Sequence, residues 1–237
     1  MSVTPASTAR RFPAWAYAMS AIVLAAWAAM VLIPMSHRIP EQSAGWLVMV
    51  VAMMVPTVAR PMMRISRGEG TRAFAFMLGY VAIWMVSLPL AIVVMGAPFW
   101  NPSSVLMLWI AVGAYQLLPS TMSHLRRCRS LDASATPAML GVRQGVACMI
   151  ACLPMMLAVM LSVMEWGMAA VPAAALLLAA SAFMIWEKSP SVTRSMIRAS
   201  GVALILASVV MFTIGLGSGS AGHEHDGASQ ASRVSMS

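Results

Sequence analysis

Residues 139 to 164 read MLGVRQGVACMIACLPMMLAVMLSVM, and Arg143 is the only charged side chain among them. A helix that crosses a bilayer needs about 20 mainly apolar residues, so this stretch is long enough to span one. The whole chain of 237 residues is 60% hydrophobic and only 9% charged. That is more apolar surface than a soluble globular domain can hide from water. We therefore expect a membrane protein.

Seven apolar segments nearly fill the chain between charged or Pro/Gly/Asn/Ser-rich breaks. They run over residues 14–35, 44–63, 73–95, 104–122, 139–164, 168–186 and 199–216. Isolated strands cannot satisfy their backbone in hydrocarbon, and the alternating pattern of a membrane barrel is missing. The sequence predicts an all-α fold, a polytopic transmembrane helix bundle of about seven spans.

The basic residues predict how this bundle is oriented. Thirteen of the fifteen Lys and Arg fall on one side of the seven segments, and only Arg38 and Arg233 fall on the other. Short loops rich in Lys and Arg stay in the cytoplasm, so we expect the N-terminus inside and the C-terminus outside. Because the net charge of +8 is spread over several loops and forms no single patch, nucleic-acid binding is not expected.

Both ends of the chain are expected to lie outside the bundle. Residues 1–12 form a cytoplasmic N-terminus, residues 13–216 the transmembrane domain, and residues 217–237 a Gly/Ser-rich, disordered extracytoplasmic tail. The tail carries His223, His225 and Asp226. Such a tract either captures Cu(II), Ni or Zn weakly or is incidental.

Sulfur is concentrated in the fifth segment, residues 139–164. Cys148 and Cys152 are four residues apart, which stacks their side chains on one helix face, and Met155 and Met156 follow. Thiolate and thioether ligands favour Cu(I). The alternative is packing, since buried Cys and Met also fill apolar cores, and a chain with 25 Met places pairs at helical spacing by chance.

A second sulfur cluster lies in the second segment. Met49 and Met53 are again four residues apart, Met54 is adjacent, and Pro56 interrupts the helix. A proline here frees backbone carbonyls at membrane depth. Met53 and Cys152 both fall near the middle of their segments, so two helices are expected to offer sulfur at one depth.

A third pair, His124 and Cys128, follows the fourth segment and has Arg126, Arg127 and Arg129 around it. The basic neighbours favour the thiolate form of Cys128. The pair is a candidate ligand set at the cytoplasmic mouth. The alternative is a juxtamembrane basic loop that holds the topology.

Several short motifs in a fixed order carry a resemblance. They are W-x-x-M-x-x-x-M-M-x-P (46–56), Y-Q-L-x-P (115–119), C-R (128–129), G-x-R-x-G-x-x-C-x-x-x-C (141–152), V-M (163–164) and E-K (187–188). Over roughly residues 44–205 the chain resembles a bacterial family of predicted metal-binding integral membrane proteins of unknown function. The resemblance implies metal binding in a bacterial cytoplasmic membrane. His124 and Ala151 stand where such proteins commonly have cysteine, so two soft ligands are replaced.

These patterns lead to one main hypothesis and one competitor. The first is a membrane protein that binds copper(I) and transfers or translocates it, with a metallochaperone as a candidate partner. The second is a non-catalytic subunit or assembly factor of a larger membrane complex, such as a copper enzyme, in which methionine faces pack against other subunits. No nucleophile, phosphate-loop or paired-carboxylate motif appears, so an enzyme is not expected. The predicted ligands are Met49, Met53, Met54, Cys148, Cys152 and Met156 inside the bundle, with His124 and Cys128 at its mouth.

Overall fold

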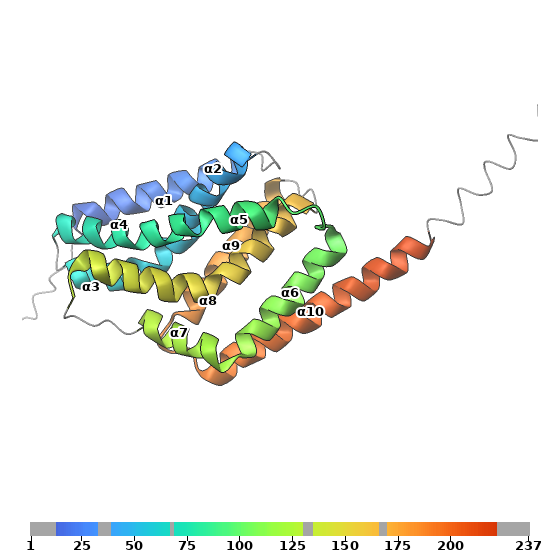
Figure 1. Cartoon of the computed structure of the whole chain (residues 1–237). Helices are drawn as coiled ribbons and strands as arrows, with labels where there is room; N and C mark the ends of the chain where they lie inside the picture. The colour runs from blue at the N-terminus through green and yellow to red at the C-terminus, as the bar shows by residue number, and fades with distance from the viewer. Residues whose placement is uncertain (1–12, 33–38, 67–68, 130–134, 166–169, 222–237) are drawn as a thin grey trace, which may run out of the picture.

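A computed structural model describes residues 13–32, 39–66, 69–129, 135–165 and 170–221, and every element in these ranges is helical (Figure 1). The elements are α1 (Ala14–Leu32), α2 (Ile39–Met49), η1 (Val50–Met54), η2 (Pro56–Val58), α3 (Ala59–Ser66), α4 (Gly70–Val86), α5 (Leu88–Met95), α6 (Pro102–Leu117), α7 (Pro119–Arg129), α8 (Pro137–Glu165), α9 (Ala170–Glu187) and α10 (Arg194–Ala221). The all-α prediction is confirmed. Residues 1–12 and the tail histidines lie outside the described residues, and α10 continues past the predicted end of the transmembrane domain at residue 216.

Each of the seven predicted segments has a helical counterpart, but fewer meet the requirements for a membrane span. Among the described residues, four helical stretches are long and apolar enough: Pro40–Ser66, Gly70–Met95, Pro137–Glu165 and Arg194–Thr213. The bent pair α6–α7 makes a fifth if it counts as one span. The remaining two, Ala14–Met30 and Val171–Glu187, are apolar but shorter.

The fourth predicted segment, residues 104–122, is not one straight helix. The axis bends by 74° between α6 and α7, because Pro119 has no N–H to continue the helical bonding and disfavours helix in the residue before it. The carbonyl of Tyr115, which Pro119 leaves without its helical donor, accepts from the Thr121 hydroxyl at 2.8 Å and from the Leu118 N–H at 3.1 Å. The bend turns α7 back against α8 (Figure 1).

Glycines bring α4 and α8 into close contact. A Cβ added at Gly79 would overlap the carbonyl oxygen of Ala138, and one added at Gly141 would overlap that of Phe76. A Cβ at Gly145 would lie 3.1 Å from the carbonyl oxygen of Tyr80. Small residues at helical spacing let two backbones approach in this way, as the Gly141-x-x-x-Gly145 spacing predicts.

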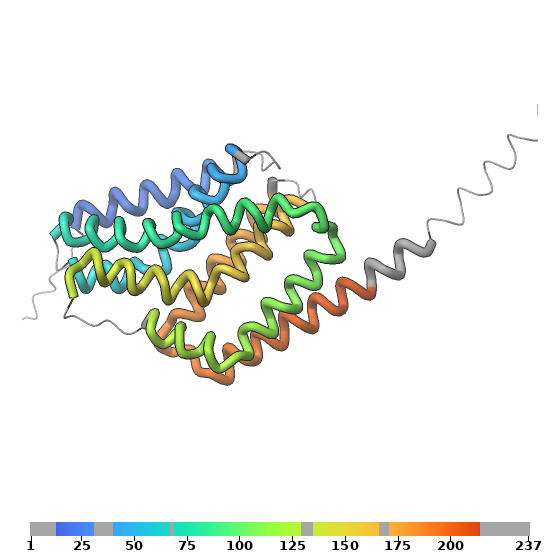
Figure 2. Tube along the Cα trace, in the orientation of Figure 1, coloured from blue at the N-terminus to red at the C-terminus, as the bar shows by residue number. Residues whose placement is uncertain are grey.

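Glycines also bring α6 and α10 into close contact. A Cβ at Gly113 would lie 2.7 Å from the carbonyl oxygen of Gly201, and the reverse distance is 2.8 Å. Figure 2 shows that this pair runs away from the other helices as an arm. The exposed surface of α10 between Val202 and Met211 is apolar, with Val202, Leu206 and Met211 all exposed.

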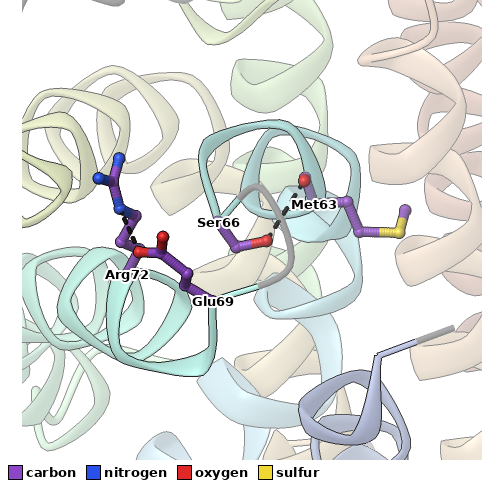
Figure 3. Close-up of polar contacts among 4 residues, drawn as sticks. All are labelled: Met63, Ser66, Glu69 and Arg72. Carbon is purple, nitrogen blue, oxygen red and sulfur yellow. Dashed lines mark hydrogen bonds and ion pairs between the residues drawn. The ribbon is translucent and has the colours of Figure 1, made fainter.

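The connection between α3 and α4 is polar. Figure 3 shows the Ser66 hydroxyl donating to the carbonyl of Met63 at 3.3 Å, and the ion pair between Arg72 Nε and Glu69 Oε2 at 2.6 Å. Both charged side chains are exposed, so the pair adds little stability. In Figure 1 the end of α3 and the starts of α1, α4 and α8 lie at one end of the molecule. The start of α2 and the end of α5 lie at the other end.

Candidate metal centre

The helix that carries Met54 is broken next to it. The backbone forms a π-helical turn over Val50–Met54 and a short 3-10 turn from Pro56, which cannot donate a backbone hydrogen bond. The Thr57 hydroxyl donates to the carbonyl of Met54 at 2.7 Å. The break predicted at Pro56 therefore fixes both the Met54 backbone and the Thr57 side chain at the centre of the molecule.

A second proline lies in the helix of the two cysteines. Pro154 is inside α8, and its missing N–H leaves the carbonyl of Ile150 without a helical donor. The Tyr115 hydroxyl from α6 donates to that carbonyl at 2.8 Å. This bond satisfies the backbone of the turn that joins Cys148 to Cys152, so α6 supports the site without contributing a ligand.

Cys148 is the centre of a sulfur cluster drawn from distant parts of the chain. Its Sγ lies 4.0 Å from Sγ of Cys152 and 3.9 Å from Sδ of Met54. The Tyr80 hydroxyl of α4 donates to the same sulfur at 3.0 Å. All four side chains are at most 1% exposed, and both cysteines are free thiols.

A lysine ammonium completes the surroundings of Cys148. Lys188 is the first residue after α9, and its Nζ donates to Cys148 Sγ at 2.8 Å and to Thr57 Oγ1 at 2.9 Å. A positive charge beside a sulfur stabilises the thiolate, which is the form that ligates metals. A cation inside an apolar bundle needs such a partner, because burying an unpaired charge is costly.

Cys128 also reaches this cluster, through the bend at Pro119. The carbonyl of Cys128 accepts from Gln144 Nε2 of α8 at 2.7 Å, and its buried side chain interacts with Cys148. His124 is half-buried one turn earlier on α7. The structure thus places Cys128 beside Cys148 and His124 one turn away on the same helix. The mouth site formed by His124 and Cys128 stays a prediction.

The other predicted ligands lie in the surrounding core. Met49, Met53 and Met156 are fully buried and belong to the same hydrophobic cluster as the two cysteines. The methionine sulfur in contact with Cys148 is that of Met54. The adjacent Met53, which the sequence placed at the depth of Cys152, lies in the same core. Its position agrees both with a role as a ligand and with a role in packing.

Three polar residues around Cys148 are not among the residues that the sequence predicted for the site: Thr57, Tyr80 and Lys188. In the sequence, Lys188 figures only as part of the E-K motif and as a loop charge. The sequence signal for Lys188 is its position directly after an apolar segment. A buried ammonium there is costly unless an anionic partner lies beside it. Tyr80 and Thr57 carry no comparable signal in an apolar sequence.

The spacing of the sulfurs suits one soft cation. With metal–sulfur bonds of about 2.3 Å, as in zinc thiolates, three sulfurs at the corners of a triangle would lie about 4.0 Å apart. Cys148 meets this spacing with both Cys152 and Met54. Within the part of the chain that the structure describes, no group of three or more His, Cys, Asp or Glu is placed to hold a metal ion. The third sulfur in contact with Cys148 is the thioether of Met54, and a thioether favours copper(I) over harder ions.

Comparison with known proteins agrees with this chemistry. A family model named PpoB2 and described as a copper chaperone matches residues 43–211, well over half of the chain. Neither the curated proteins nor the solved structures contain a match. The match confirms the metal-related part of the resemblance drawn from the motifs and supports copper handling. The chain belongs to the PpoB2 family of copper chaperones.

Proposed function

We propose that this protein is a membrane-embedded copper(I) chaperone that binds the ion between Cys148, Cys152 and Met54 and delivers it to a recipient protein. The observation that carries the proposal is the contact of Cys148 Sγ with both a thiol and a thioether sulfur in a fully buried site. Soft sulfur ligands select Cu(I). Burial keeps water from the thiolates and the ion.

We further propose that the chain lies in the bacterial cytoplasmic membrane with seven spans and its N-terminus inside. The charge asymmetry of the loops supports this orientation. The alternation of helix ends between the two ends of the molecule (Figure 1) fits successive crossings of a membrane. The shorter helices α1 and α9 would be the two marginal spans.

Delivery requires that the ion can leave. A Lys188 ammonium already bonded to Cys148 offers a way to stabilise the thiolate once the ion has gone. The position of Cys128 next to Cys148, on a helix that ends in a basic stretch, makes it the residue through which we expect the ion to be exchanged.

The test is metal retention by the purified full chain in detergent, under anaerobic and reducing conditions. Wild type is loaded with Cu(I), freed of excess ion in the presence of a Cu(I) chelator, and its metal content is measured by mass spectrometry. We expect about one ion per chain in wild type and none in Cys148→Ser with Cys152→Ser, because serine oxygens are poor ligands for Cu(I).

Two methionine variants distinguish ligation from packing. Met54→Leu removes the sulfur beside Cys148, whereas Met107→Leu changes an exposed methionine on α6. We expect weaker retention in the first and wild-type retention in the second. Wild-type stoichiometry and affinity in the double cysteine variant would rule out this site.

A further inference from the structure

The Lys188 side chain contacts the proposed site but cannot ligate a cation. A protonated lysine has three donors and no lone pair. Yet its Nζ is 2.8 Å from Cys148 Sγ, the sulfur that contacts both other proposed ligands. Thr57, itself fixed to the Met54 carbonyl, holds the ammonium there. Any ion bound by Cys148 would have this positive charge as a near neighbour.

The repulsion between this charge and a bound ion grows with the charge of the ion. At a given distance, Coulomb energy is proportional to the product of the charges, so a divalent ion is repelled twice as strongly as a monovalent one. The low polarity of the buried surroundings strengthens the effect. The thiolates likewise attract a divalent ion twice as strongly as a monovalent one. The lysine charge acts in the opposite direction and shifts the preference of the site toward the monovalent ion.

Glu187 is a second charged group close to the cysteines. It is 5% exposed at the end of α9 and acts electrostatically on Cys152. A negative charge there attracts both ions and favours the divalent one. Removal of the lysine charge nevertheless shifts the preference toward the divalent ion, whatever Glu187 contributes, because Glu187 is the same in wild type and in a variant without the Lys188 charge.

We propose that Lys188 is a specificity-determining residue, whose charge shifts the site formed by Cys148, Cys152 and Met54 toward a monovalent soft cation and away from a divalent one. This inference rests on the proposed function, since it concerns the same site. It gives Lys188 a role that packing alone does not: an uncharged side chain of similar length would fill the space but lose the selectivity.

The experiment compares wild type with Lys188→Met, which keeps the length of the side chain, and with Lys188→Arg, which keeps the charge. Each purified full chain is equilibrated with a mixture of Ag(I), used as a redox-stable stand-in for Cu(I), and Cd(II), a soft divalent ion. The ratio of bound Ag(I) to bound Cd(II) is then measured by mass spectrometry after desalting. We expect this ratio to fall at least about tenfold in Lys188→Met and to stay near the wild-type value in Lys188→Arg.

An unchanged ratio in Lys188→Met, with either ion still bound, would overturn the selectivity role and leave the copper site standing. A wild-type protein that retains neither ion would contradict the proposed function itself, and the inference with it. If Lys188→Met does not elute as a single species, Lys188→Gln serves as the uncharged variant under the same criteria.

Discussion

The α4–α8 pair and the α6–α10 pair use the same contact but have different surroundings. In both pairs a glycine on one helix meets a backbone carbonyl on the other, at Gly141 with Phe76 and at Gly201 with Gly113. In the most apolar window of each span, 56% of α8 is buried inside the molecule, compared with 17% of α10. Close helix packing is therefore common to both, and burial distinguishes them.

The two helix pairs also differ in the side chains that they carry. Cys148, Cys152, Tyr80 and the Lys188 ammonium meet around α8, whereas the exposed residues of α10 between Val202 and Met211 are all aliphatic or methionine. Polar and ionisable groups inside a bundle are costly and mark functional sites. The exposed surface of α10 between Val202 and Met211 lacks them, which suits contact with lipid. Variants in the two pairs should therefore have different consequences for metal binding.

The largest effect is expected from Gly141→Leu. The new side chain would overlap the Phe76 carbonyl, which belongs to a helix backbone and cannot move aside alone. Overpacking of a core costs about 1–3 kcal/mol, and a backbone clash belongs at or above the upper end of that range. Separation of α4 from α8 would also withdraw the Tyr80 hydroxyl from Cys148. We expect a fall of several degrees in the melting temperature in detergent together with weaker Ag(I) binding.

Val146→Leu, on an exposed position of α8, is the matched control and should behave as wild type in both measurements. Wild-type Ag(I) affinity in a destabilised Gly141→Leu protein would show that the α4–α8 contact does not position the site.

A smaller and more selective effect is expected from Gly201→Leu. The added side chain would meet the Gly113 carbonyl and force α10 away from α6, so the melting temperature should fall. No proposed ligand lies on either helix. Ag(I) stoichiometry and affinity should therefore match wild type, and a loss of binding equal to that in Gly141→Leu would erase the distinction between the two pairs.

Part of the candidate site could be predicted from the sequence, and the limits of that prediction have physical causes. Helical spacing predicts that Cys148 and Cys152 share a face, and the break at Pro56 beside Met54 is a local property of proline. Equal depth led us to expect that Met53 and Cys152 offer their sulfurs at one level, whereas the contact in the structure joins Cys148 to Met54, 94 residues away in the chain. Depth fixes one coordinate of a side chain in a bundle and leaves its rotation about the helix open, so it could not choose between Met53 and Met54.

Lys188 and the bend at Pro119 show two further limits. The sequence presents Lys188 as a loop charge that sets topology, because side-chain spacing rules do not say where a long flexible stem will point. The apolar run over residues 104–122 suggests one span, although Pro119 lies inside it. The apolar composition of this stretch predicts one straight helix, whereas Pro119 bends it. This bend brings Cys128 to Cys148.

The smallest of the three effects is expected from Tyr115→Phe, which acts where the two regions meet. The change deletes only the hydroxyl that the arm helix α6 donates to the Ile150 carbonyl of α8. Loss of one partner leaves a carbonyl unsatisfied beside Pro154, at a cost of about 1–3 kcal/mol. We expect a modest fall in melting temperature and a small loss of Ag(I) affinity, because the backbone between Cys148 and Cys152 would be held less firmly. Ser103→Ala, which also deletes one hydroxyl, on an exposed position of α6, is the control. If Tyr115→Phe lowers stability but leaves Ag(I) affinity unchanged, the arm supports the fold of α8 without tuning the site, and the comparison between the two helix pairs becomes sharper still.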